Sequence, residues 1–312
     1  MKFPVSVSKI LRIFKEVHGE GERPFRILLI GQKGAGKSSL GAWFLLGNPD
    51  LSEQSLNSVA VCDLDSKGDR LAEALTRAEG ASLILFVLDA KAKNHRNQTA
   101  VLERLKEKDK PLLIVLNKRD LVKEVGGLKK EIAELFQVPS GRVILTSATA
   151  GTGVQSELFP KITALSDGFD LALANRLPVF SSPVADRIVR RTAYQNAFIG
   201  GLVFLPGADM PILTLNQMRM LSKIAYIYGE ELRLERLKEL LVALGSGFAF
   251  RSLARSLVSF IPGFGWSVKA GVAYGGTLSL GKAAIKYFET KVGRPKGRPL
   301  QASTQKSSGR EK

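Results

Sequence analysis

The chain has little of what disulfide-stabilised and metal-centred proteins need. Its 312 residues include one cysteine, Cys62, and two histidines. A single thiol excludes an intrachain disulfide framework, and one thiol with two imidazoles argues against a structural zinc site. Cys62 lies in an apolar run and is expected to be a small buried side chain. A reducing, cytoplasmic compartment is therefore expected.

Long apolar runs are also missing. The longest stretch without a charged group is 192–208, which Pro206 interrupts, and the next in the C-terminal half is 256–268. A spanning helix needs about 20 apolar residues, so neither run predicts a single span. Such runs suit buried helices or a segment that dips into a bilayer, and the sequence leaves open whether 197–285 crosses, enters or only touches one. The N-terminus has no apolar core with a cleavage site, so no secretory signal is expected.

What the chain does have is enough apolar content to fill a core and a strong positive charge. Hydrophobic residues make up 45% of the sequence, and the net charge is +17. A basic surface favours anionic partners, either nucleic acid or acidic lipid, although a solvated surface with a basic tail is the plainer explanation. The tail, 291–312, combines prolines, serines and basic residues and is predicted to be disordered.

The apolar pattern changes along the chain. Residues 1–22 contain a short basic amphipathic helix with Val7, Ile10, Leu11, Phe14 and Val17 on one face. This helix either lies on a membrane surface or packs against the rest of the protein.

Strand-length apolar runs then alternate with helical segments. The runs are at 25–30, 59–64, 83–88, 112–116 and 143–145. Alternation of this kind predicts right-handed crossovers and a mainly parallel, doubly wound α/β sheet that is buried on both faces.

A phosphate-binding loop follows the first run. Residues 31–38 read GQKGAGKS and match GxxxxGK[ST] between a strand and a helix. Glycines let backbone N–H groups wrap phosphates, Lys37 is expected to reach the β- and γ-phosphates, and the Ser38 hydroxyl is expected to ligate Mg²⁺. The candidate binding residues of this segment are Gly31, Gly34, Ala35, Gly36, Lys37, Ser38 and Ser39.

A second motif, NKRD at 117–120, comes directly after the fourth apolar run. It resembles the NKxD motif of the Ras-like GTPase superfamily. The resemblance implies that Asp120 pairs with two nitrogens on the edge of guanine, that Asn117 ties this loop to the phosphate loop, and that the Lys118 stem covers the base. It implies GTP or GDP with Mg²⁺ as ligands.

A third match lies at Ser147 and Ala148, after the fifth run. It resembles the SA motif whose backbone N–H groups meet guanine O6. The resemblance covers 25–166, and Asp89 at the end of the third run also suits the Era-like branch with its MMR-HSR type G domain. A P-loop G domain is therefore expected over 23–166.

The switch segment departs from this pattern. The best DxxG candidate is Asp65 to Gly68, where the resemblance implies that Asp65 holds Mg²⁺ through water and Gly68 contacts the γ-phosphate; an ordinary polar turn is the alternative. No threonine lies between Ser38 and Thr76, so the usual switch I ligand is missing. The serines that could replace it are Ser52, Ser55 and Ser58.

Two further departures concern hydrolysis. Asp69 stands where Ras-like proteins carry a water-orienting glutamine, and Gly34 stands where potassium-stimulated relatives carry asparagine. Slow intrinsic GTP hydrolysis, or none without a partner, is therefore expected.

The C-terminal half is expected to be all-α, apolar and rich in Gly and Ala. After a polar linker at 167–186, the range 187–290 resembles the YcjF-like family, which is often fused to Era-like GTPases. The matching segments begin at Arg190, Pro206, Leu213, Ile224, Ile261 and Gly275. The resemblance implies membrane association on the cytoplasmic face, but no reaction.

Three functions remain open from the sequence. The first is a membrane-associated GTPase switch that engages an anionic membrane surface. The second is an RNA- or ribosome-associated assembly GTPase, although no KH-type GxxG or aromatic RNP motif is present in the C-terminal half. The third is a GTP-binding scaffold without hydrolysis.

Overall fold

The N-terminal half is built on one parallel sheet. The computed structural model describes residues 7–46, 53–64, 70–92, 94–202, 210–230 and 265–292. The five strands stand in the order β2-β1-β3-β4-β5, and each neighbouring pair is parallel. The strands are β1 (Ile27–Gln32), β2 (Val59–Leu64), β3 (Leu83–Asp89), β4 (Leu112–Asn117) and β5 (Val143–Leu145). The predicted α/β fold is confirmed.

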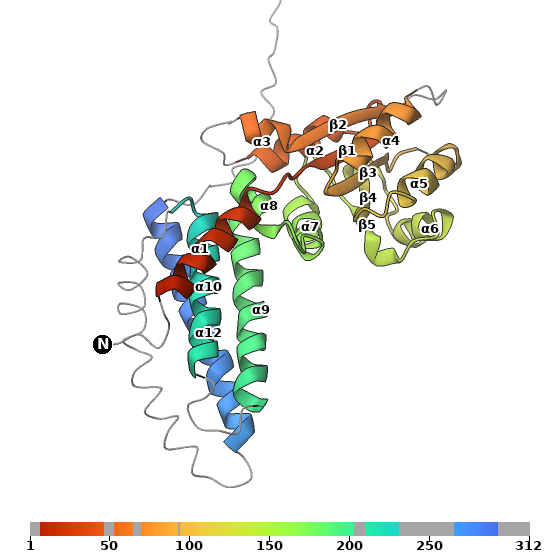
Figure 1. The fold of residues 1–312 in the computed structure, drawn as a ribbon. Coiled ribbons are helices and arrows are strands. Elements are labelled where there is room, and N and C mark those ends of the chain that lie inside the picture. Colours follow the sequence, from red (N-terminus) through yellow and green to blue (C-terminus); the bar gives the residue numbers. More distant parts are fainter. Residues whose placement is uncertain are drawn as a thin grey trace, which may run out of the picture.

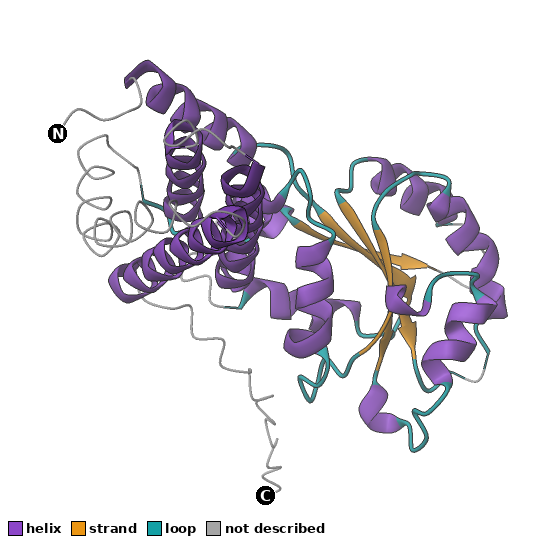
Figure 2. Cartoon of the chain, turned by 90° about the horizontal axis from the view of Figure 1, so that it is seen from below, coloured by secondary structure: helices purple, strands orange, loops and turns teal. Residues whose placement is uncertain are grey.

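Both faces of the sheet are buried, as Figure 2 shows by the helices on either side. Successive strand residues point to opposite faces. Leu29 and Leu85 accordingly belong to one apolar core, whereas Ile30 and Phe86 belong to the other. This double burial explains why the strands read as unbroken apolar runs.

Helices of the N-terminal half divide between the two faces. Ala74, Leu102 and Ile132 anchor three of them on one face. These are α4 (Leu71–Glu79), α5 (Thr99–Lys106) and α6 (Leu128–Leu135). The opposite face is covered by α2 (Lys37–Leu45) and α7 (Phe159–Ala164), and α3 (Glu53–Asn57) precedes β2. Short 3₁₀ or π-helical turns are at Arg96–Gln98, Arg119–Leu121, Ser140–Arg142, Val154–Leu158 and Pro178–Phe180.

The C-terminal half is helical, as predicted. It contains α8 (Asp170–Arg176), α9 (Ser181–Leu202), α10 (Met210–Ile227) and α12 (Gly265–Val292), and α9 packs along α12 (Figure 1). The close approach is at Gly281, where an added Cβ would lie 2.4 Å from Val189. Gly271 and Gly275, which have the GxxxG spacing that permits close helix contact, have no described atom within 4 Å of such a Cβ.

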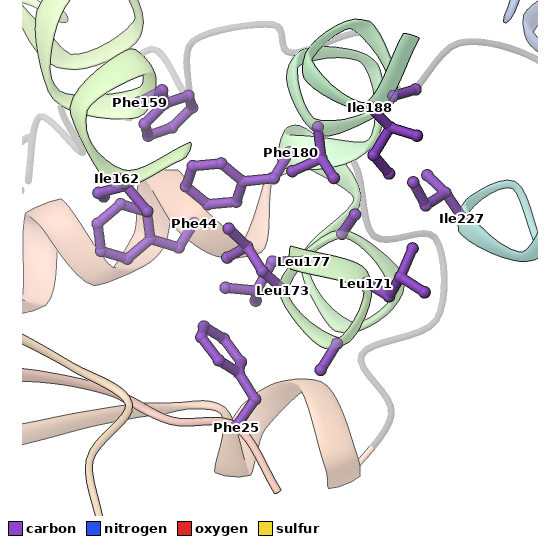
Figure 3. Close-up of a cluster of buried hydrophobic side chains, with 14 of the residues drawn as sticks. Phe25, Phe44, Phe159, Ile162, Leu171, Leu173, Leu177, Phe180, Ile188 and Ile227 are labelled. Carbon is purple, nitrogen blue, oxygen red and sulfur yellow. The ribbon is translucent and has the colours of Figure 1, made fainter. Parts of the chain in front are cut away.

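One hydrophobic core joins the two halves (Figure 3). Phe44 of α2 lies 5.8 Å from Phe159 and 6.0 Å from Phe180, ring centroid to centroid, and Phe159 lies 4.8 Å from Phe180. The same core continues through Leu171 to Ile227 of α10. The range 167–186, expected as a polar linker, therefore holds α8 and the start of α9, because its apolar side chains have a surface to pack against.

Helix α1 (Val7–Gly21) lies across the helical half and contacts α10 and α8 (Figure 1). Its buried side chains are Ile10, Ile13 and Val17. Leu11, which the sequence placed on the apolar face, is 56% exposed, and Ile13 takes its place because the steps 10, 13 and 17 follow the helical period.

Buried polar side chains meet where α9, α10 and α12 converge. The Asn196 amide donates to Thr277 Oγ1 at 2.9 Å and accepts from Asn216 Nδ2 at 2.9 Å, while Gln217 also donates to Thr277 at 3.2 Å. Three of the segments that carried the resemblance in this half thus converge in one network. None of the helices among the described residues combines the length and apolar character that crossing a bilayer requires.

Candidate functional site

The phosphate loop connects β1 to α2 at the carboxyl edge of the sheet. β1 lies beside β2 on one side and β3 on the other, and this reversal of strand order is where open α/β sheets bind ligands. Gly34 and Gly36 have φ of +83° and +90°, which favours glycine. A Cβ at Gly31 would lie 2.1 Å from the Val87 carbonyl oxygen, and a Cβ at Gly36 would lie 2.1 Å from Asn117 Nδ2. Close packing therefore requires glycine at 31 and 36, and at 36 the positive φ favours glycine too.

Lys37 is the buried cation of the loop, at 3% exposure. Its ammonium donates to the carbonyl oxygens of Gly31 at 2.9 Å and Gln32 at 2.7 Å, and pairs with Asp63 Oδ1 at 2.6 Å. The hydroxyls of Ser38 and Ser39, in the first turn of α2, belong to exposed residues. The loop therefore holds the buried Lys37 ammonium in a fixed position next to two exposed hydroxyl groups that could bind a metal ion.

Asp63 is a site residue that the sequence reasoning missed. It is the last but one residue of β2 and pairs with Gly31 in the register of β1 and β2, so it lies next to the phosphate loop. The hydrogen bond from Lys37 holds the pKa of the Asp63 carboxyl below its ordinary value of 3.8. The ion pair is therefore present at neutral pH and is lost as the pH falls through the lowered pKa. The sequence candidates Asp65 and Gly68 lie outside the described residues.

Asn117 joins three loops into one site. Its side chain is 1% exposed and donates through Nδ2 to the Ala35 carbonyl at 3.0 Å. Its Oδ1 accepts from the Ala148 N–H at 2.9 Å and from the Thr146 hydroxyl at 3.3 Å. The first and third sequence motifs, whose bonded residues lie 82 positions before and 31 positions after Asn117, are thus held to the second motif by one amide.

Lys118 and Asp120 extend from the same loop. Lys118 has φ of +65° and pairs with Asp89 Oδ2 at 2.6 Å. Asp89 stands opposite Asn117 in the register of β3 and β4, so the pair bridges the carboxyl ends of these strands. Asp120 lies in the Arg119–Leu121 turn and is exposed. Its carboxylate is accessible to an incoming ligand.

The third motif is arranged differently from the expectation. The Ser147 N–H donates to the Thr152 carbonyl at 2.8 Å, and the Ala148 N–H donates to Asn117. Both N–H groups expected to meet guanine O6 are thus engaged within the protein, because this loop also has to fix the Asn117 amide. The loop is further held by the Trp43 indole, which donates to the Ala148 carbonyl at 2.8 Å. No sequence motif indicated this role for Trp43.

Two of the serines considered as switch I ligands lie at the wrong edge of the sheet. Ser55 and Ser58 are 4% and 0% exposed, and the Ile27 N–H donates to the Ser58 carbonyl at 2.8 Å. That contact is at the start of β1, whereas the phosphate loop is at its end. Ser55 and Ser58 therefore do not supply a ligand to this site, and Ser52 lies outside the described residues.

No protein-family model matches the chain. GTPase Era of Geotalea uraniireducens is 34% identical over 82 residues, 26% of this chain and 28% of that protein. GTPase Era of Mesorhizobium japonicum is 34% identical over 91 residues, 29% of each. GTPase Der of Rhodopseudomonas palustris is 26% identical over 43% of this chain and 36% of its own length.

A solved structure described as a probable GTP-binding protein engB matches with a TM-score of 0.36 and 20% identity, over 45% of this chain and 97% of that one. The chain spans between 28% and 36% of the length of the curated relatives. These similarities support a P-loop GTPase G domain in part of the chain.

Proposed function

We propose that this chain binds guanine nucleotides, with phosphates at 31–38 and the base at 117–120. The observation that carries the proposal is the Asn117 amide, which bonds the phosphate loop on one side and the third motif on the other. A loop of this kind at the end of β4 puts an acceptor carboxylate, Asp120, within one turn of the same amide. Adenine does not offer the pair of N–H donors that this carboxylate would read.

The residues fit Mg²⁺ as the cation of such a site. Among the described residues no group of three or more His, Cys, Asp or Glu side chains could hold a metal, and the donors beside the loop are the Ser38 hydroxyl and the Asp63 carboxylate. Hard oxygen donors in small number suit Mg²⁺, which takes its remaining ligands from phosphates and water. Mg²⁺ would supply charge neutralisation between the phosphates. Ser38 would bind it directly, with Asp63, or Asp65 as the sequence suggests, orienting its water.

The binding proposal is tested by equilibrium titration of the full chain with fluorescently labelled GDP, competed by unlabelled GDP, GTP and ATP. We expect GDP and GTP to displace the label and ATP to fail. Displacement by ATP at similar concentrations would refute a guanine-reading site.

Hydrolysis is proposed to be slow. Asp69 stands where a water-orienting glutamine is expected, and Lys37 already uses its donors within the loop and on Asp63. Single-turnover cleavage of GTP should therefore be slow. A rate comparable with that of GTPases that carry the glutamine would contradict this expectation.

For the partner, we propose a switch that engages an anionic membrane surface from the cytoplasmic side, through a YcjF-like helical domain at 187–290. The exposed rings of Tyr194 and Phe198, 65% and 68% accessible, and the shared core between α2 and the helical half support coupling of nucleotide to that surface. Flotation on anionic vesicles should depend on the nucleotide. Equal flotation with GDP and a GTP analogue would refute the switch.

The second candidate is an RNA- or ribosome-associated GTPase, which the charge of +17 and the similarity to GTPase Era favour. Salt-sensitive co-sedimentation with ribosomes, together with no flotation, would select it. If the chain binds guanine nucleotide but neither sediments with ribosomes nor floats with vesicles, the third candidate, a non-hydrolysing GTP-binding scaffold, is favoured.

A further inference from the structure

A polar cavity lies away from the phosphate loop, between α1, α9 and α10. Its volume is about 740 Å³, and it is bordered by one face of each helix. On α1 and just beyond, the lining positions 15, 16, 19, 20 and 23 follow the helical period. The volume is in the range of sites that hold small molecules, roughly 300–1,000 Å³.

The cavity is lined with charged groups where helices usually meet through apolar ones. Five lining residues are cationic and three are carboxylates. The five are Lys15, Arg23, Arg191, Arg219 and Lys223, and the three are Glu16, Glu20 and Asp170. The cavity is therefore electropositive.

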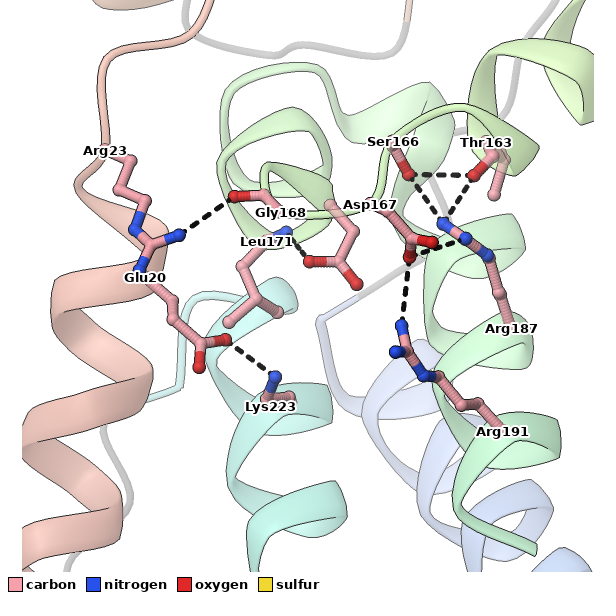
Figure 4. Close-up of polar contacts among 11 residues, drawn as sticks. Glu20, Arg23, Thr163, Ser166, Asp167, Gly168, Leu171, Arg187, Arg191 and Lys223 are labelled. Atoms are coloured by element: carbon pink, nitrogen blue, oxygen red, sulfur yellow. Dashed lines mark hydrogen bonds and ion pairs between the residues drawn. The ribbon is translucent and has the colours of Figure 1, made fainter. Parts of the chain in front are cut away.

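Two of the three lining carboxylates, Glu16 and Glu20, are already held in ion pairs, and Oδ1 of the third, Asp170, accepts the Leu171 N–H at 3.0 Å. Glu16 accepts from Arg219 at 2.6 Å and from Arg12 at 3.0 Å, and the hydrogen bond from Arg219 lowers the Glu16 pKa. Glu20 pairs with Lys223 at 2.6 Å (Figure 4). Arg219 and Lys223 of α10 thus compensate the negative charge of Glu16 and Glu20 on α1, so these two carboxylates repel an incoming anion only weakly.

The remaining lining cations, Lys15, Arg23 and Arg191, are not neutralised by Glu16 or Glu20. Arg23 donates through Nη1 to the Gly168 carbonyl at 3.2 Å, and Arg191 shares Asp167 with Arg187, at 2.9 and 2.8 Å (Figure 4). The exposed Lys15 has no bonded partner among the residues that the structure describes.

The face of α1 at Gly19 leaves open space beside the cavity. A Cβ built on this residue meets no described atom within 4 Å, so the helix face that looks into the cavity is open at this point. Gly19 is also costly within a helix, and no close helix contact explains it.

We propose that this cavity is a binding site for a multiply charged, phosphate-bearing anion, separate from the nucleotide site of the phosphate loop. Lys15, Arg23 and Arg191 supply its contacts, since guanidinium groups pair with phosphate through two N–H donors. The ligand joins α1 to α9. Because α1 leads through Phe25 directly into β1, whose end is the phosphate loop, the anion clamps the segment that enters the nucleotide domain.

The test is calorimetric titration of the full chain with inorganic pyrophosphate at two salt concentrations. Pyrophosphate also suits the phosphate loop, so Lys37→Ala is included to remove that site. We expect this variant to keep the second site, and Lys15→Gln with Arg191→Gln to weaken it about tenfold or more. The matched control is Lys130→Gln, at an 80% exposed side chain of α6, which should change nothing.

Gly19→Leu tests whether binding needs the open space of the cavity, independently of its charged side chains. It leaves every cation in place and should abolish the second site while the chain remains folded, because leucine is a better helix former than glycine. Hydrogen exchange of the α1 amides should slow with pyrophosphate in the Lys37→Ala variant and not in Gly19→Leu. Equal binding by Lys37→Ala with and without the cavity substitutions, or no binding by Lys37→Ala at all, would overturn the proposal. Loss of the Lys37-dependent site alone in Lys37→Ala is the result the proposal predicts, whereas an unchanged number of bound pyrophosphates in Lys37→Ala would count against the phosphate loop and not against the cavity.

Discussion

Replacing Asn117 with alanine should test how the three loops of the site are held together. The substitution removes one donor and one acceptor from a side chain that is 1% exposed. It leaves the Ala35 carbonyl, the Ala148 N–H and the Thr146 hydroxyl without the partners they have at 3.0, 2.9 and 3.3 Å. The same loops are also joined by the Trp43 indole at the Ala148 carbonyl and by the Arg119 N–H at the Thr146 carbonyl, at 2.8 and 3.0 Å, but neither contact supplies a partner to the three groups that lose the amide.

The expected cost follows from those contacts. A net hydrogen bond contributes about 0.5–1.5 kcal/mol, and a buried group left unpaired costs about 1–3 kcal/mol. For three contacts, of which the 3.3 Å one is the weakest, we expect the free energy of unfolding to fall by about 2–4 kcal/mol. Nucleotide affinity should fall by more than this stability loss predicts, because the phosphate loop and the base loop are no longer fixed relative to each other.

The assay is urea unfolding of the chain without nucleotide, followed by GDP titration under conditions where both proteins are folded. Asn94→Ala is the matched control, since the Asn94 side chain caps only an exposed turn, with Oδ1 accepting from the Arg96 N–H at 2.8 Å. We expect the control to lose less than about 1 kcal/mol. Equal destabilisation by Asn117→Ala and Asn94→Ala would refute the view that this amide organises the site.

Three further substitutions test neighbouring parts of the account. Trp43→Phe removes the indole N–H that donates to the Ala148 carbonyl of the third motif. It should speed GDP release several-fold and lower the free energy of unfolding by about 1 kcal/mol. An unchanged release rate would show that this hydrogen bond does not hold the loop. Phe180→Ala empties a fully buried position between the halves and should cost about 3–5 kcal/mol in urea unfolding, whereas a surface-like loss below about 1 kcal/mol would contradict the shared core. Asp63→Asn should weaken the Mg²⁺ dependence of GTP binding more than Asp65→Asn does; the reverse order would restore the sequence assignment.

The strands and the phosphate loop could be predicted closely because their causes are local. The runs at 59–64 and 143–145 are the observed β2 and β5, and the run at 25–30 differs from β1 by two residues. Parallel strands buried on both faces have to be apolar throughout, and a loop that turns through positive φ has to contain glycine. Such requirements act on neighbours in the chain.

The missed features depend on contacts between distant segments. Asp63 is identified by its register with Gly31, and Trp43 by a bond to a carbonyl 105 positions away, neither of which leaves a motif. The buried face of α1 shifted from Leu11 to Ile13 because α10 and α8 decide which side is covered. A polar-looking connection became α8 for the same reason, since packing partners outside the segment stabilise it.

The central claim is that Asp120 recognises the edge of guanine, next to the Asn117 side chain that holds the three loops of the site together. The most direct measurement is the affinity of the wild-type chain and of Asp120→Asn for GDP, XDP and ADP in the presence of Mg²⁺. The account predicts that the wild type binds GDP and not ADP, and that Asp120→Asn loses GDP and gains XDP, because the amide donates to the oxygen that xanthine carries in place of the guanine amino group. GDP binding that is unchanged in Asp120→Asn, or equal binding of ADP and GDP by the wild type, would contradict it.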